Sequence, residues 1–116
     1  MGLARRRGIG GEALAAAFLE LIGCEVVARN VRESGVEVDL VVADGPARAL
    51  VEVKLRGRSD YGGAALAVDH TKQARLLRAA RAMAGAWRGP VRIDVVAIEL
   101  AGDQATLRHY RNAVTE

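Results

Sequence analysis

The sequence contains a single cysteine, Cys24, and only four aromatic residues among its 116. One cysteine cannot form an internal disulfide bond and cannot supply a cysteine-rich zinc site, which fits a reducing compartment. With so few aromatic rings, base stacking on a broad aromatic platform is not an expected mode of binding. Any nucleic-acid contact would therefore depend on charged and polar groups.

Long apolar runs are also missing. No stretch reaches the length that spans a membrane, and the basic start MGLARRR is not followed by the apolar run of a signal peptide. The two histidines, His70 and His109, lack metal-ligand spacing and are interpreted as loop or surface residues. We expect a cytoplasmic protein with no membrane partner.

What is present is a globular composition in which 51% of residues are hydrophobic, with a net charge of +3. The length predicts one domain over residues 1–116. A basic balance suits an anionic partner, and nucleic acid is the commonest one. Net charge alone does not separate such a protein from a basic protein without that partner.

The hydrophobic periodicity predicts the order helix, three strands, helix, two strands, which is a mixed α/β architecture. The expected elements are a helix from Gly10–Glu12 to Ile22, strands 25–29, 36–43 and 49–56, a helix 71–87, and strands 91–100 and 105–112. Leu14, Phe18, Leu21 and Ile22 form the expected buried stripe of the first helix. In the second helix this stripe runs from Leu76 to Trp87, and Lys72, Arg75 and Arg78 lie off it.

Charged residues inside two predicted strands are the informative feature, because Asp and Glu are depleted from strands. Glu37 and Asp39 alternate with Val36, Val38, Leu40 and Val42, which are expected on the opposite face. Glu52 and Lys54 share one face of the next strand. The short turn between the strands predicts an antiparallel hairpin, so these four groups can converge.

Neighbouring carboxylates repel, and a divalent cation relieves their repulsion. Oxygen ligands favour Mg²⁺ or Mn²⁺, which can acidify a bound water and stabilise charge on a phosphate. Asp39 and Glu52 are the expected ligands, with the carbonyl group of Val53 as a possible third, and Lys54 would hold the attacking water or the oxyanion. The alternative is an ordinary solvated Glu52–Lys54 pair on the polar face of a strand.

Other charged residues also allow two interpretations. Glu12 near a helix start is favoured by the helix dipole without any function, but it could also reach the acidic cluster. Several basic residues could contact phosphates or could simply form the solvated surface. The basic candidates for nucleic-acid binding are Arg5, Arg6, Arg7, Arg56, Arg58, Lys72, Arg75 and Arg78.

The sequence also resembles a known family over nearly its whole length. The segments GGEALAAAFLELIGCEVVARNVR, VEVDLVV, LVEVKLRGRSDYGGAALAVDHTKQARLLRAA, VRIDVVAIEL and RNAV resemble the YraN-like family of small bacterial proteins. That family is similar to the archaeal Holliday-junction resolvases and belongs to the PD-(D/E)XK nuclease group.

The resemblance implies a restriction-endonuclease-like three-layer core, with a central mixed five-stranded sheet flanked by helices, and Mg²⁺-dependent cleavage of phosphodiester bonds. The group's signature falls on Glu12, Asp39, Glu52 and Lys54. The resemblance also adds Glu37 as a metal-ligand candidate and Lys72 and Gln73 as nucleic-acid contacts. One departure occurs at Val36, where the family has glycine and this chain has Gly35 one place earlier, so a slightly altered turn is expected before Glu37.

Two functions follow as hypotheses. The first is a metal-dependent endonuclease acting on DNA, with branched or structured DNA as one substrate class. Branched DNA has two-fold symmetry, so a resolvase would need a homodimer, although the sequence shows no dimer interface. The second is a non-catalytic nucleic-acid-binding or protein-interaction module that is derived from a nuclease fold.

Overall fold

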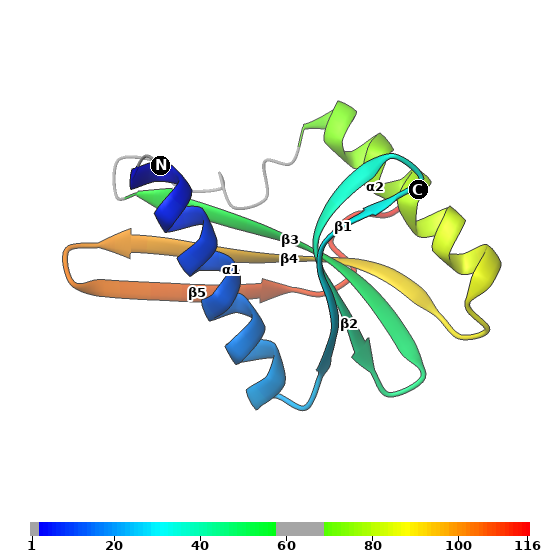
Figure 1. Cartoon of the computed structure of the whole chain (residues 1–116), viewed down its shortest axis with the longest axis horizontal. Coiled ribbons are helices and arrows are strands. Elements are labelled where there is room, and N and C mark those ends of the chain that lie inside the picture. The colour runs from blue at the N-terminus through cyan, green and yellow to red at the C-terminus, as the bar shows by residue number, and fades with distance from the viewer. Residues whose placement is uncertain (1–2, 58–68) are drawn as a thin grey trace.

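The computed structural model describes residues 3–57 and 69–116, with side chains from residue 10 onward in the first segment. Two helices and five strands follow in the predicted order (Figure 1). Their bounds are α1 Leu3–Leu21, β1 Glu25–Glu33, β2 Val36–Asp44, β3 Ala47–Gly57, α2 His70–Ala86, β4 Val91–Ala101 and β5 Gln104–Tyr110. Within these described segments, neither helix combines the length and the apolar character needed to cross a bilayer.

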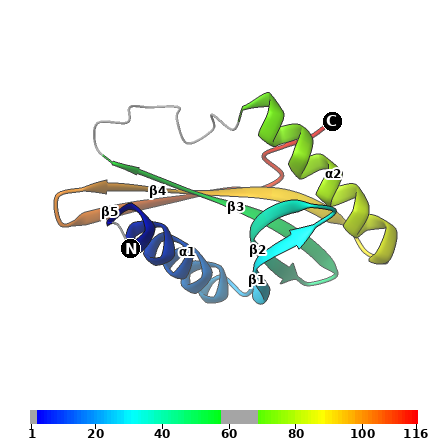
Figure 2. The same cartoon turned by 45° about the horizontal axis from the view of Figure 1, so that its top comes forward.

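The five strands form one sheet in sequence order, β1-β2-β3-β4-β5. Neighbouring strands are antiparallel except β3 and β4, which are parallel and are connected through α2. The predicted β2–β3 hairpin is present, with Gly45 at a positive φ of 57° in its turn. Helices α1 and α2 cover opposite faces of the sheet (Figure 2). The predicted α/β three-layer core with a mixed five-stranded sheet is therefore confirmed.

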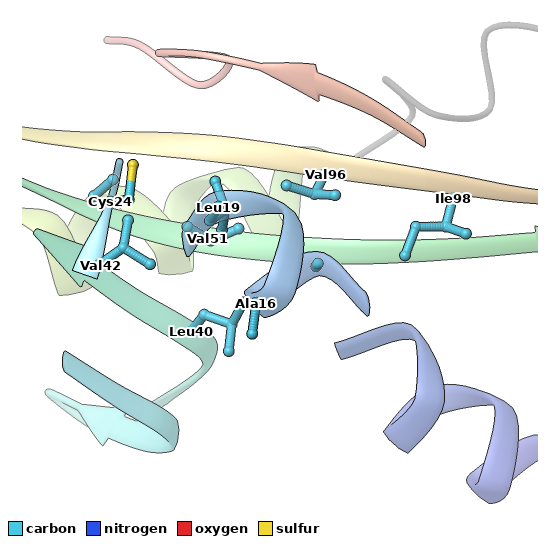
Figure 3. Packing of buried hydrophobic residues seen from close by; sticks show 10 residues of the cluster. Ala16, Leu19, Cys24, Leu40, Val42, Val51, Val96 and Ile98 are labelled. Carbon is cyan, nitrogen blue, oxygen red and sulfur yellow. The ribbon is translucent and has the colours of Figure 1, made fainter. Parts of the chain in front are cut away.

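Helix α1 packs on the sheet through small residues. Ala15, Ala16 and Leu19 are almost completely buried against a cluster that includes Leu40, Val51, Val96 and Ile98 (Figure 3). The predicted stripe is wrong by about one position, since Leu14, Leu21 and Ile22 are 43%, 86% and 45% exposed. Alanine side chains let the helix backbone approach the sheet closely, and the periodicity argument gave them too little weight.

Helix α2 covers the other face of the sheet. Leu76 and Ala79 are fully buried in a second cluster with Leu50, Ile93 and Val95, and Leu77, Ala80 and Met83 pack at its margin. The helix begins after Asp69, whose carboxylate accepts the N–H of Lys72 at 2.8 Å as a capping bond. This cap fixes where the basic side chains of the first turns of α2 emerge.

Two predicted boundaries were wrong in ways that affect the candidate site. Helix α1 begins at Leu3 and includes glycines that are usually costly inside a helix, so Glu12 lies in mid-helix. Strand β1 extends to Glu33, and the turn is formed by Ser34 and Gly35 alone, both with positive φ.

The predicted division of faces along β2 was also wrong. Leu40 and Val42 pack on the α1 side of the sheet, whereas Val36 and Val38 pack on the α2 side with Val41. The change occurs around Asp39, which lies opposite Asn30 in the register of β1 and β2. Asn30 has a φ of 49°, a left-handed conformation that asparagine tolerates better than most residues. Strict alternation cannot anticipate such an irregularity.

Candidate metal and nucleic-acid site

Strands β2 and β3 separate near the candidate site. Their pairing runs from Asp44–Ala47 to Leu40–Val51, beyond which β3 pairs only with β4 among the described residues. At this point the Oδ2 atom of Asp39 accepts a hydrogen bond from the backbone N–H of Val53 at 2.8 Å. The Asp39 side chain thus accepts the N–H of Val53 at a point where β2 no longer pairs with β3. This bond holds Asp39 beside Glu52.

Glu52 projects toward the α2 side of the sheet, because Val51, Val53 and Leu55 alternate with it toward the α1 side. Its side chain is only 10% exposed, and its Oε2 atom lies 3.6 Å from the Nζ atom of Lys72 at the start of α2. That distance makes an ion pair but is too long for a hydrogen bond. The buried Oε2 atom therefore has no hydrogen-bond partner among residues 3–57 and 69–116.

Lys54 follows Glu52 on the same face of β3. Its charge lowers the pKa of both Asp39 and Glu52, so it lies close enough to act on the two carboxylates. Within the described part of the chain, the ion pair to Glu52 comes from Lys72 and none is formed by Lys54. The structure thus brings a second lysine to the acids and leaves Lys54 available for another anion.

Glu12 reaches the same site from α1. Its side chain hydrogen-bonds to the side chain of Asn30, and the charges of Asp39 and Glu37 act on it. The helix-dipole explanation for Glu12 fails, because the first turn of α1 contains no acid and Glu12 lies well inside the helix. Asn30 was missed as a site residue, and its only sequence signal is an asparagine within a predicted turn.

The pKa values of Glu12, Asp39 and Glu52 are shifted in the same direction. Burial is the largest cause that raises the pKa of Glu12, Asp39 and Glu52 above the ordinary carboxyl value. Repulsion from Asp39 raises the pKa of Glu12 and of Glu52 further. The hydrogen bond from Val53 and the nearby lysines lower the pKa of Asp39 without cancelling the shift. An added positive charge nearby would stabilise the ionised forms of these three acids.

A small divalent cation fits this set of donors. Asp39 and Glu52 provide two neighbouring carboxylates, and the unpartnered Glu52 Oε2 is an oxygen free to accept a ligand bond. The described residues contain no group of three or more His, Cys, Asp or Glu side chains close enough to hold a metal ion. The arrangement therefore fits an ion that is held by one or two carboxylates and keeps several waters, as Mg²⁺ does in proteins.

The predicted nucleic-acid residues divide into two groups. Lys72 and Arg75 line a polar cleft beside α2, and the exposed Glu37 contributes to its lining from the margin of the β1–β2 hairpin. Arg56 is half-buried further along β3, and the backbone N–H of Gln73 donates to the carbonyl group of Asp69 in the first turn of α2. Arg58 lies outside the described residues. Arg78, which was also considered as a phosphate contact, lines the cleft too. Arg32 lines it as well and was missed, because a single arginine on a strand carries no motif.

A separate charged network lies on the α1 side of the sheet. Asp94 is fully buried, and its carboxylate accepts hydrogen bonds from Arg92 at 2.9 and 3.2 Å and from the N–H of Asn112 at 3.0 Å, with His109 at 2.8 Å. His109 was expected at the surface but is only 8% exposed, and its ring meets Phe18 of α1 edge-on. Its polar atoms are satisfied within the fold, which makes this network structural.

Known proteins similar to this chain form one family. The model of "Uncharacterised protein family UPF0102" matches residues 11–98. A UPF0102 protein of Halorhodospira halophila is 44% identical over 82% of this chain and 78% of its own length. One from Nitratidesulfovibrio vulgaris is 39% identical over 89% of this chain and 79% of its own length. The UPF0102 protein YraN of Salmonella agona is 46% identical over 66% of this chain and 59% of its own length.

Proposed function

The chain belongs to the UPF0102 family, and from this premise we propose that it is a Mg²⁺- or Mn²⁺-dependent endonuclease that hydrolyses phosphodiester bonds of DNA. The proposal extends the predicted resemblance to the PD-(D/E)XK nucleases. Fold analogy alone is a weak basis for an activity, so the argument depends on the acids of the site.

One observation carries the proposal. Asp39 and Glu52 meet where β2 and β3 separate, both have a raised pKa, and Glu52 keeps a buried oxygen without a hydrogen-bond partner. The raised pKa of both acids means that their ionised forms are held at a cost to stability, even though Asp39 also accepts the N–H of Val53. Carboxylates with a raised pKa beside lysines are typical of sites that bind a cation or transfer protons.

The roles of the residues follow from their positions. Asp39 and Glu52 would hold the ion, with the carbonyl group of Val53 as a further ligand and Glu12 and Glu37 adding negative charge nearby. The bound ion would supply Lewis-acid stabilisation of a phosphate and a more acidic water. Lys54, which forms no ion pair among the described residues, would orient the attacking water or stabilise the developing oxyanion.

Branched DNA is the substrate class that we propose within this activity. A four-way junction has two-fold symmetry, so its symmetric cleavage calls for two copies of the site. Light scattering of the protein with and without a junction would test the homodimer. A monomer in both conditions would contradict paired cleavage but would leave cutting of linear or flapped DNA possible.

The decisive experiment is a nuclease assay on linear, flapped and four-way-junction DNA with Mg²⁺, Mn²⁺ or EDTA, alongside the Glu52→Gln variant. We expect metal-dependent cutting that the variant loses. Glu99→Gln is the matched control, since Glu99 is an exposed acid on β4. Cutting that persists in Glu52→Gln, or in EDTA, would contradict the proposed site.

The second candidate function is a binding module that holds nucleic acid without cutting it. The observation that favours it is the basic cleft beside the site, together with the lack of a three-ligand group among the described residues. Salt-sensitive binding without cleavage of any substrate, under all metal conditions, would support this function over the enzyme.

A further inference from the structure

A cleft of about 420 Å³ lies between the end of the β1–β2 hairpin and the first half of α2. Arg32 of β1 and Lys72, Arg75 and Arg78 of α2 contribute four cations to its lining, and Glu37 of β2 contributes the one carboxylate. Arg32 and Glu37 are direct partners across the hairpin, and Val36 and Val38 beside them pack toward α2. Arg32 and Glu37 therefore project from the other face of the hairpin and line the cleft from its margin. The cleft therefore carries an excess of positive charge that comes from two elements, β1 and α2.

Internal ion pairs do not neutralise this charge. In the part of the chain that the structure describes, the four cations form one ion pair, between Lys72 and Glu52, while Arg32 donates to the carbonyl group of Gly35 at 3.3 Å. Lys72, Arg75 and Arg78 follow each other at intervals of three, which puts like charges on one helix face at some cost in stability. Such a row is stabilised when an anion lies along it.

The N-terminus of α2 is not the source of the positive charge in the cleft. The first turn of α2 already has a cap, because Asp69 accepts the N–H of Lys72. The N–H of Lys72 is therefore already occupied, and an anion in the cleft would meet the side chains of α2 and β1. This arrangement suits an extended anion better than a single small ion.

We propose that this cleft binds the sugar-phosphate backbone of a DNA strand and reads no base sequence. Lys72 to Arg78 spans about 9 Å along the helix, since each residue rises about 1.5 Å. One strand of a duplex advances about 3.4 Å per phosphate, so the row faces two or three phosphates. Among the described lining residues no side chain is aromatic, so these residues offer no surface for base stacking.

The cleft leads directly to the acidic site. Lys72 lines the cleft and also pairs with Glu52, so a strand that follows the cations arrives beside Asp39 and Glu52. The inference rests in this respect on the proposed function, which places a phosphodiester at those acids. Glu37 lies in the cleft with the opposite charge, and it would weaken binding of a phosphate.

The test is a fluorescence-anisotropy titration of labelled DNA oligonucleotides of two unrelated sequences, in EDTA, at salt concentrations from about 50 to 200 mM. The variant is Arg75→Gln combined with Arg78→Gln, and the control is Arg88→Gln, an exposed arginine beyond the far end of α2. We expect the slope of log affinity against log salt to fall by about 1 for each cleft cation removed. The control should match the wild type, and both sequences should bind alike.

Glu37→Gln should have the opposite effect on affinity. It removes the negative charge in the cleft and should tighten binding of both oligonucleotides. Circular dichroism and thermal unfolding would verify that each variant folds. An unchanged salt slope in the double variant, an equal loss in Arg88→Gln, a strong preference between the two sequences, or failure of the wild type to bind DNA would each overturn the inference.

Binding in EDTA is independent of cleavage, so the two proposals can fail separately. Cleft-dependent binding without any metal-dependent cutting would overturn the endonuclease and leave the cleft supported. Cutting that the double variant performs with wild-type efficiency at subsaturating DNA would overturn the cleft and leave the endonuclease supported.

Discussion

The carboxylate of Asp39 on β2 accepts the backbone N–H of Val53 on β3 at 2.8 Å, where the two strands part. This bond gives Asp39 two separate roles. Its oxygen completes the hydrogen bonding of β3, and its charge contributes to the proposed cation site. Substitutions that remove the charge but keep the acceptor can separate the two roles.

Asp39→Asn and Asp39→Ala should therefore behave differently. Alanine leaves the N–H of Val53 without its acceptor, which should lower the free energy of unfolding by about 1–3 kcal/mol. Asparagine retains an acceptor oxygen and should be nearly as stable as the wild type. Calorimetric titration should show that both variants lose Mn²⁺ binding, and urea unfolding should show that only alanine loses stability. Wild-type Mn²⁺ affinity in Asp39→Asn would exclude Asp39 as a ligand.

Glu52→Gln should stabilise the metal-free protein. Burial and Asp39 raise the pKa of Glu52, so its ionised form is less favourable in the native state than in the unfolded chain. The contribution of Glu52 to the stability of the native protein therefore becomes more unfavourable as the pH rises from the ordinary carboxyl range through the raised pKa. At pH 7 the variant should gain about 0.5–2 kcal/mol, and the gain should shrink as the pH is lowered.

Thermal unfolding in EDTA over a series of pH values would measure this gain, with Glu99→Gln as the exposed control. A lower melting temperature for Glu52→Gln at pH 7 would mean that the ion pair with Lys72 outweighs the cost of burial. In excess Mg²⁺ the wild type should instead melt at a higher temperature than Glu52→Gln, because an ion that binds only the native wild type adds to its stability.

The sequence could predict the layers of the fold because they depend on features with a clear period. The alternation of Val51, Val53 and Leu55 with charged residues specified the buried strand β3, and Gly45 with Pro46 specified the hairpin turn. The acids Asp39 and Glu52 were found since charges inside strands are rare enough to need a reason.

The other features of the site and the burial of His109 could not be predicted, because they depend on three-dimensional contacts. The left-handed backbone of Asn30 and its bond to Glu12 come from an irregularity between β1 and β2 that breaks the two-residue period. Lys72 contacts Glu52 across the gap between α2 and β3, and no local pattern signals that pair. The burial of His109 requires β4 and β5 to pair in one register.

Lys54→Ala should leave metal binding intact and remove most cleavage. Lys54 is near Asp39 and Glu52 without pairing to a described carboxylate, which leaves its ammonium group available for the phosphate or the attacking water. Loss of one oxyanion-stabilising donor lowers the rate constant by about 10²–10³-fold. Single-turnover cleavage would measure this fall, and calorimetry would verify that Mn²⁺ still binds. Full activity in Lys54→Ala would remove the role that we assign to it, and Arg88→Ala controls for the lost charge.

Asp94→Ala should be the most destabilising of these substitutions, although Asp94 lies on the other face of the sheet from Glu52. Its removal takes two hydrogen bonds from Arg92, which keeps only the pair with the partly exposed Asp44, and it leaves the N–H of Asn112 without an acceptor. Breaking a buried pair in this way costs about 3–5 kcal/mol, which urea unfolding at pH 7 would measure. Arg81→Ala breaks only the exposed pair with Glu116 and should leave the unfolding midpoint unchanged.

The pH dependence of Asp94 separates it from the site acids. Burial alone would raise the pKa of Asp94, but hydrogen bonds from Arg92, Asn112 and His109 outweigh it and lower the pKa. Asp94 therefore stabilises the fold above the ordinary aspartate pKa of about 3.9, and this contribution disappears as pH falls through the lowered value. Glu52 acts with the opposite sign and at higher pH. If Asp94→Ala unfolded at the same acid midpoint and urea concentration as the wild type, the network would not be the structural anchor that its hydrogen bonds indicate.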